Sequence, residues 1–80
     1  MKDYKKLKVG MIFINKSGEL IEILGLLPFL FDGDWCVKTK ILERGTSSHK
    51  VRRKGCTIGT SVGALDDYEL LPKIKAELIK

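Results

Sequence analysis

Short runs of apolar and polar residues alternate along this chain and are separated by residues that favour turns. Residues 8–14 are rich in strand-forming side chains, residues 15–18 have the composition of a turn, and residues 19–24 resume an apolar, β-branched run. This spacing predicts a β-hairpin in which Gly18 has a positive φ. Gly25 is expected to form a bulge or bend where the second strand ends.

A third strand is predicted over residues 35–42, after a turn at residues 32–34, because its side chains alternate in type with period two. The face expected to enter the core carries Trp35, Val37, Thr39 and Ile41. The face expected to meet solvent carries Cys36, Lys38 and Lys40.

The sequence then becomes polar and rich in small residues. Residues 43–48 predict a loop at a hairpin tip, and residues 50–57 predict a strand that is interrupted near Gly55. Small side chains over residues 58–63 predict a further loop or a strongly bent strand.

The last part of the chain predicts three short elements. A helical turn is expected at residues 66–68, with Asp66 as its cap. A final strand over residues 69–71 ends at Pro72, and residues 73–80 form a short helical tail. In that tail Ile74 and Leu78 are four residues apart and share one face.

These elements predict a mainly β fold in one domain, with a small closed or partly open barrel over residues 7–72 and a helical tail over residues 73–80. A parallel βαβ architecture is excluded because no crossover helix fits between the strands. The chain has 80 residues. A domain of this size buries only about 60 to 65 % of its unfolded surface, which leaves little room for a deep catalytic cleft.

Part of this pattern resembles a known architecture. Residues 9–14, the turn at Gly18 and residues 20–24 look like the first hairpin of small SH3-like barrels of the KOW and Tudor type, and residues 67–71 are similar to their helical turn and closing strand. Small phage-encoded regulatory proteins often show the same sequence pattern. The resemblance implies about five antiparallel strands and a non-catalytic binding domain, and an OB-like barrel is the alternative. It leaves the ligand open, since such barrels bind nucleic acids, peptides and proteins.

Charge is concentrated in one segment. The chain has 15 Lys and Arg against 10 Asp and Glu, and residues 44–55 hold five of these cations with no acidic residue, so this segment accounts for the net charge of +5. Such a local excess attracts polyanions. The predicted binding residues, for nucleic acid or for an acidic protein surface, are Lys38, Lys40, Arg44, Lys50, Arg52, Arg53 and Lys54. Strand alternation would place Lys50, Arg52 and Lys54 on one face.

A second candidate surface is the apolar run at residues 26–31. If this segment is a loop that projects Leu27, Phe29 and Phe31 outward, it marks a homodimer or protein interface. The alternative is a loop that covers the open end of the barrel. The runner-up function is therefore a protein-interaction factor, such as a small regulator or inhibitor that docks on a larger host complex.

Other classes of function have little support in the sequence. Adjacent Ser48 and His49 do not by themselves make a catalytic triad, and the spacing of Cys36, Cys56 and the single histidine fits no common zinc site. We expect no enzymatic activity and no cofactor. The chain has no apolar run long enough for a membrane span and no signal-peptide pattern, so a cytoplasmic protein without a membrane partner is expected.

Overall fold

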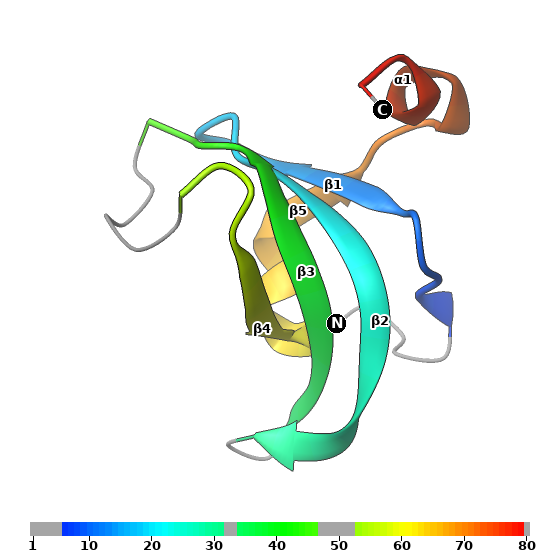
Figure 1. The fold of residues 1–80 in the computed structure, drawn as a ribbon, viewed down its shortest axis with the longest axis vertical. Coiled ribbons are helices and arrows are strands. Elements are labelled where there is room, and N and C mark those ends of the chain that lie inside the picture. Colours follow the sequence, from blue (N-terminus) through cyan, green and yellow to red (C-terminus); the bar gives the residue numbers. More distant parts are fainter. Residues whose placement is uncertain (1–5, 32–33, 47–52, 80) are drawn as a thin grey trace.

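The computed structural model describes residues 6–31, 34–46 and 53–79, and for residues 28–31, 34, 73 and 79 it describes the backbone alone. The prediction of a mainly β chain is confirmed. The elements, in chain order, are β1 (Ile12–Asn15), β2 (Leu20–Phe31), β3 (Asp34–Glu43), β4 (Thr57–Ser61), the 3₁₀ helix η2 (Val62–Asp67), β5 (Tyr68–Leu70) and α1 (Lys73–Ile79) (Figure 1).

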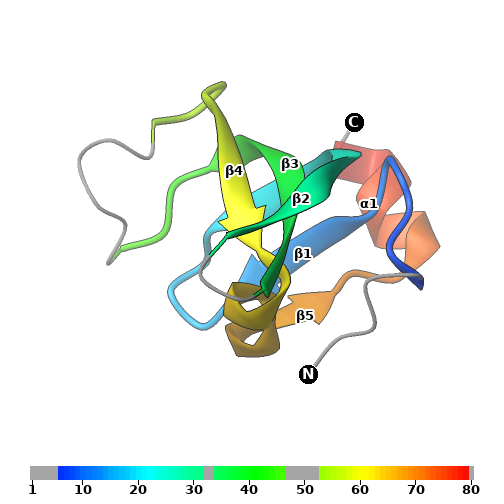
Figure 2. The same cartoon turned by 90° about the horizontal axis from the view of Figure 1, so that it is seen from below.

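The five strands form one open antiparallel sheet in the order β4-β3-β2-β1-β5. The long strands β2 and β3 bend along their length, which gives the sheet a curved shape (Figure 1). The edge strands β4 and β5 are connected through η2, which lies between their ends (Figure 2). The main core cluster therefore forms on the inner side of a curved sheet, and the outer side is partly covered, since Ile12 on β1 is also fully buried.

The β1–β2 hairpin is confirmed, and one side chain organises its turn. The Asn15 side-chain oxygen accepts hydrogen bonds from the Ser17 amide at 3.0 Å, from its hydroxyl at 2.8 Å and from the Glu19 amide at 2.9 Å. Gly18 has φ +88°, as predicted. The expected start of β1 at residue 8 is wrong, because a turn with Gly10 at φ 96° precedes the strand.

The strand β2 is longer than predicted. Gly25 does lie at a register shift against β3, but the strand continues beyond it to Phe31. The expected loop at residues 27–31 is therefore wrong. Another register shift, between Leu27 and Leu30, brackets Pro28, which has no amide hydrogen to donate to the ladder.

The predicted faces of β3 are correct in its centre and wrong at its start. Val37, Thr39 and Ile41 are fully buried. Trp35 is 43 % exposed, because β4 pairs with β3 only from Cys36 onward and does not extend beside the indole. Cys36, expected in solvent, is 5 % exposed and is paired with Leu27 of β2.

The segment expected as a loop at residues 58–63 forms β4 and the start of η2. Inside the sheet, the hydroxyls of Thr39 and Thr60 are hydrogen-bonded at 3.0 Å, which satisfies two polar groups within the core. The cap of η2 is Ser61, whose hydroxyl accepts from the Ala64 amide, and not Asp66, which lies within the helix.

The main core cluster combines side chains from the inner faces of the strands, from η2 and from Leu7. Val62 and Leu65 of η2 are 2 % and 0 % exposed, so this short helix covers the apolar side of the sheet. The buried members of the cluster are Leu7, Phe13, Ile21, Ile23, Val37, Ile41, Val62, Leu65 and Tyr68. Each of these larger apolar side chains stabilises the fold by about 1.5 to 3 kcal/mol relative to an exposed position.

The predicted helical tail forms α1, but its apolar face is turned away from the core. Ile74 and Leu78 are 76 % and 82 % exposed, whereas Ala76 is buried. The helix therefore contacts the rest of the chain through a small side chain.

A buried polar contact joins the β1–β2 hairpin to the last strand. Glu19 is 2 % exposed, and its carboxyl oxygen accepts a hydrogen bond from the Tyr68 hydroxyl. A buried polar group without a hydrogen-bond partner lowers the stability of the fold. This bond therefore favours the observed position of the hairpin turn against β5.

We expect the substitution Tyr68→Phe to lower the free energy of unfolding by about 1 to 3 kcal/mol, since it removes a donor to the buried Glu19 carboxyl. Urea denaturation followed by circular dichroism measures this change. The matched control is Glu69→Gln at the adjacent, exposed position of β5, which should leave stability unchanged. Equal stability of Tyr68→Phe and the parent protein would contradict the role given to this bond.

Gly45 holds the start of the β3–β4 connection close to the β1–β2 turn. An ideal Cβ at Gly45 would lie 2.0 Å from the Ser17 hydroxyl oxygen and 3.0 Å from the Glu19 amide nitrogen. The neighbouring Thr46 amide donates to the Ser17 carbonyl at 2.9 Å. Two segments that are distant in sequence thus pack in contact because residue 45 has no side chain.

The substitution Gly45→Ala should destabilise the protein by about 1 to 3 kcal/mol, because the added methyl group cannot fit without movement of the turn. A thermal melt compares it with Gly59→Ala, whose Cβ would meet only Leu27 Cδ1 at an ordinary 3.9 Å. We expect little change in the control. A Gly45→Ala protein as stable as the control would show that the connection is not held this closely.

Candidate functional site

The outer face of β3 carries two of the predicted cations. Lys38 and Lys40 are exposed, and as residues two apart on a strand they point to the same side with a separation of about 7 Å. Lys38 lies between Gly25 of β2 and Gly59 of β4. Because neither neighbour has a side chain, the Lys38 ammonium group is accessible from both sides.

Lys40 has a different environment. Its neighbours are Glu22 on β2 and Thr57 on β4. A carboxylate directly opposite on an antiparallel strand lowers the positive potential around Lys40. Thr57 is the first residue of β4, so Lys40 also lies beside the point where the β3–β4 connection rejoins the sheet.

The β3–β4 connection, residues 44–56, contains the segment that carries the charge excess. Beyond the contact at Gly45, its second end is fixed by hydrogen bonds to β3: the Gly55 amide donates to the Ile41 carbonyl at 2.7 Å, and the Ile41 amide donates to the Cys56 carbonyl at 2.9 Å. Gly55 has φ +87° in this turn. Both ends of the connection are therefore attached to the sheet.

Three exposed cations, Arg44, Arg53 and Lys54, lie at these two ends. The Lys54 ammonium is 3.4 Å from the Glu43 carboxylate, with side chains 71 % and 56 % exposed. An ion pair this exposed adds little stability, but it reduces the positive charge that Lys54 presents. Among the described residues, Lys38, Lys40 and Arg53 make no ion pair.

The expected alternation of cations along a strand is wrong at Lys54, because this residue and Gly55 form a turn and β4 begins only at Thr57. Lys50 and Arg52 lie outside the described residues. In the structure Lys38 and Lys40 lie on β3, and Arg44, Arg53 and Lys54 lie at the two ends of the connection that follows this strand. We refer to these five residues as the basic face.

The second predicted surface, at Leu27, Phe29 and Phe31, lies on a strand and not on a loop, because β2 extends to Phe31. Leu27 is half-buried, and it lies across the sheet toward Gly59 of β4. The backbones of Phe29 and Phe31 belong to β2, and their side chains lie outside the described residues. In place of an exposed loop, this segment is the end of a paired strand in which Leu26 is 41 % exposed.

Two free thiols stand out among the other potentially reactive side chains of the described residues. Within residues 6–31, 34–46 and 53–79, no group of three or more His, Cys, Asp or Glu side chains could hold a metal ion. Cys36 and Cys56 are free thiols, the first buried and the second half-buried. Ser47, Ser48 and His49 lie outside this part of the chain. No helix in it is both long and apolar enough to cross a bilayer.

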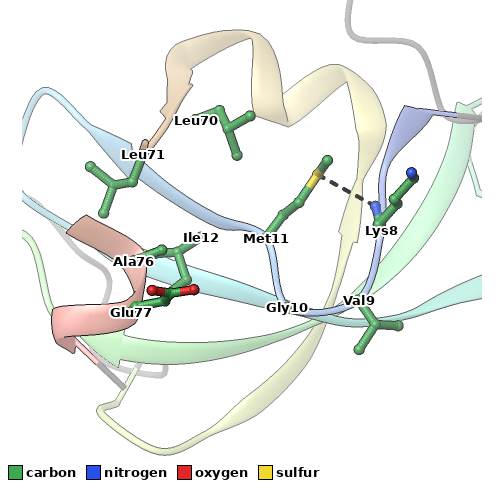
Figure 3. Close-up of a pocket in the computed structure, with 9 residues that line it drawn as sticks. All are labelled: Lys8, Val9, Gly10, Met11, Ile12, Leu70, Leu71, Ala76 and Glu77. Atoms are coloured by element: carbon green, nitrogen blue, oxygen red, sulfur yellow. Dashed lines mark hydrogen bonds between the residues drawn. The ribbon is translucent and has the colours of Figure 1, made fainter. Parts of the chain in front are cut away.

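One surface feature was not predicted from the sequence. A groove of about 590 Å³ lies between residues 8–12, the end of β5 and α1 (Figure 3). The spacing of Ile74 and Leu78 indicated an apolar helix face, but it did not indicate that this face would be exposed.

In comparisons with known proteins, no family model, no curated protein and no solved structure matches the chain.

Proposed function

We propose that this protein is a non-catalytic binding module whose basic face contacts the phosphate backbone of a nucleic acid. The observation that carries the proposal is the position of Lys38 and Lys40: they are exposed, and their row ends where the cation-rich connection joins the sheet. A separation of about 7 Å along a strand is close to the spacing of phosphates in an extended nucleic-acid strand. A nucleic-acid ligand also implies an intracellular setting.

The order and pairing of the strands support an SH3-like architecture for this module. Consecutive strands pair from β1 to β4, and a 3₁₀ turn leads from β4 into a short closing strand beside β1. The resemblance implied about five antiparallel strands, with a helical turn before a short closing strand. In this proposal the sheet presents the exposed side chains of β3 to the nucleic acid, and its inner side does not bind a small molecule.

Binding of this kind depends strongly on salt, because each phosphate contact releases a counterion. If Lys38, Lys40, Arg44 and Arg53 each contact one phosphate, the logarithm of the association constant should fall by about 3 per tenfold rise in salt. Between roughly 50 and 200 mM salt, the affinity should then fall about a hundredfold.

The first test is a fluorescence-anisotropy titration against single-stranded DNA, duplex DNA and RNA oligonucleotides at these two salt concentrations. The double substitution Lys38→Gln and Lys40→Gln should weaken binding about tenfold or more and reduce the salt slope by about 2, since two contacts are lost. The matched control is Lys75→Gln, which removes an exposed cation from α1 and should leave the affinity unchanged.

Two outcomes would contradict the proposal. One is no binding to any oligonucleotide at the lower salt. The other is an equal loss of affinity in the double variant and in Lys75→Gln, which would indicate attraction by net charge without a defined site.

A second substitution should act in the opposite direction. Glu43→Gln removes the partner of Lys54, so we expect binding to the same oligonucleotides to strengthen about two- to fivefold. Glu69→Gln on β5 makes the same change in net charge away from the basic face and should have little effect. Unchanged affinity in Glu43→Gln would mean that Lys54 takes no part in binding.

The alternative function is docking on an acidic face of a larger protein complex. The observation that favours it is the interleaving of acidic side chains with the cations: Glu22 opposite Lys40, and Glu43 beside Lys54. A mixed surface of this kind is typical of the polar rim of a protein interface. The absence of nucleic-acid binding in the titration would favour this alternative.

A further inference from the structure

The sheet has almost no side chains around Lys38. Gly25 on β2 and Gly59 on β4 lie directly beside this residue, one on each side. Side chains of directly paired residues point to the same face of a sheet, so a side chain at either glycine would lie on the exposed face with Lys38. The two glycines are about 10 Å apart across the three strands. We call these three paired residues the glycine strip.

The fold itself does not require a glycine at Gly59. Its φ is not positive, and its pairing with β3 has no register shift. Among the described residues, an ideal Cβ at Gly59 would meet only Leu27 Cδ1 at 3.9 Å, and one at Gly25 would meet no atom within 4 Å. A glycine inside a strand weakens the strand, and it often marks a place where a ligand approaches the backbone closely. The glycine strip is therefore open to a ligand.

Gly59 also presents backbone hydrogen-bonding groups at the edge of the sheet. The strand β4 is an end strand of the five-stranded sheet. The Ile58 carbonyl accepts a hydrogen bond from the Thr39 hydroxyl at 3.2 Å, so it points toward β3. Backbone groups of successive residues in a strand point to alternate sides, so the Gly59 amide and carbonyl point to the open edge. Since Gly59 is exposed, one donor and one acceptor are accessible side by side.

The surroundings of Gly59 suit a flat polar group that carries an anion. A Leu27 methyl group borders the open space, and Lys38, which makes no ion pair among the described residues, lies beside it. A nucleotide combines a flat base, donors and acceptors along the base edge, and one phosphate. In a duplex the flat faces are stacked and the pairing edges are occupied, so only an unpaired strand can present both.

We propose that the ligand of the basic face is a single-stranded nucleic acid, with one base against the backbone of Gly59 and a phosphate near Lys38. This inference rests on the proposed function, and it adds the strandedness of the ligand and a base contact. The cation beside the open edge favours such a ligand over a neutral peptide that adds a strand to β4.

Removal of the bases tests the inference without any change to the protein. Fluorescence anisotropy compares a deoxythymidine oligonucleotide of about eight nucleotides, a length within the range of single-strand sites on small β folds, with an abasic strand of equal length and charge. The parent protein should bind the thymidine strand about three- to tenfold more tightly, the gain expected from one or two hydrogen bonds. The salt slopes should be equal, since the phosphates are the same.

A side chain at residue 59 should remove this preference. Gly59→Val fills the space over the backbone but keeps every cation, and valine is favourable in a strand. Its affinity for the thymidine strand should fall to that for the abasic strand, while binding of the abasic strand stays unchanged. The matched control is Thr57→Val, at an exposed position two residues away on the same face of β4, which should keep the preference. A thermal melt checks that both variants are folded.

The outcomes separate this inference from the proposed function. Equal affinity of the parent protein for the thymidine and abasic strands would overturn the base contact, and so would a preference that survives Gly59→Val. In either case, weaker binding by the Lys38→Gln and Lys40→Gln variant would still support the basic face as a phosphate contact. Binding to neither strand at the lower salt would overturn the proposed function and the base contact together.

Discussion

A five-stranded sheet with one apolar face is stable only if that face is covered, and in this chain the cover is the short helix η2. Val62 and Leu65 of η2 are buried in the core cluster, and the helix packs on β3 and on the edge strands β4 and β5. Without them, the inner surfaces of Ile23, Val37 and Ile41 would meet water. The curvature of the sheet follows from the same need, since a flat sheet of this size could not enclose a common core.

This arrangement decides where side chains are available for binding. Because the inner face is used for the core, the cations of β3 can only lie outside, and their neighbours on β2 and β4 determine how accessible they are. Lys38 lies between two glycines, whereas Lys40 lies opposite a carboxylate. Two lysines that look alike in the sequence therefore have different environments in the sheet. The contact at Gly45 then holds the cation-rich connection to the β1–β2 turn.

The two surfaces that the structure presents differ in physical character. The basic face is polar and presents exposed cations on β3 and on the connection that follows it, which suits long-range attraction and salt-dependent contact. The surface around α1 is largely apolar and includes a groove. In Figures 1 and 2, the described ends of the β3–β4 connection lie away from α1.

The sequence by itself determined the features that depend on local chemistry. Period-two alternation placed Val37, Thr39 and Ile41 in the core, Gly18 marked the hairpin turn, and charge counting located the cation-rich segment. It also indicated the helical turn before β5, though with the wrong cap.

Only the tertiary structure decided the features that depend on which segment lies beside which. Trp35 is exposed because β4 does not extend beside it, Lys54 is paired because the turn at Gly55 brings it to Glu43, and Glu19 is buried because Tyr68 reaches it from a strand far along the chain. The exposure of Ile74 and Leu78 has the same origin. A helical pattern shows that an apolar face exists, but the direction of that face is set by the surface on which the helix packs.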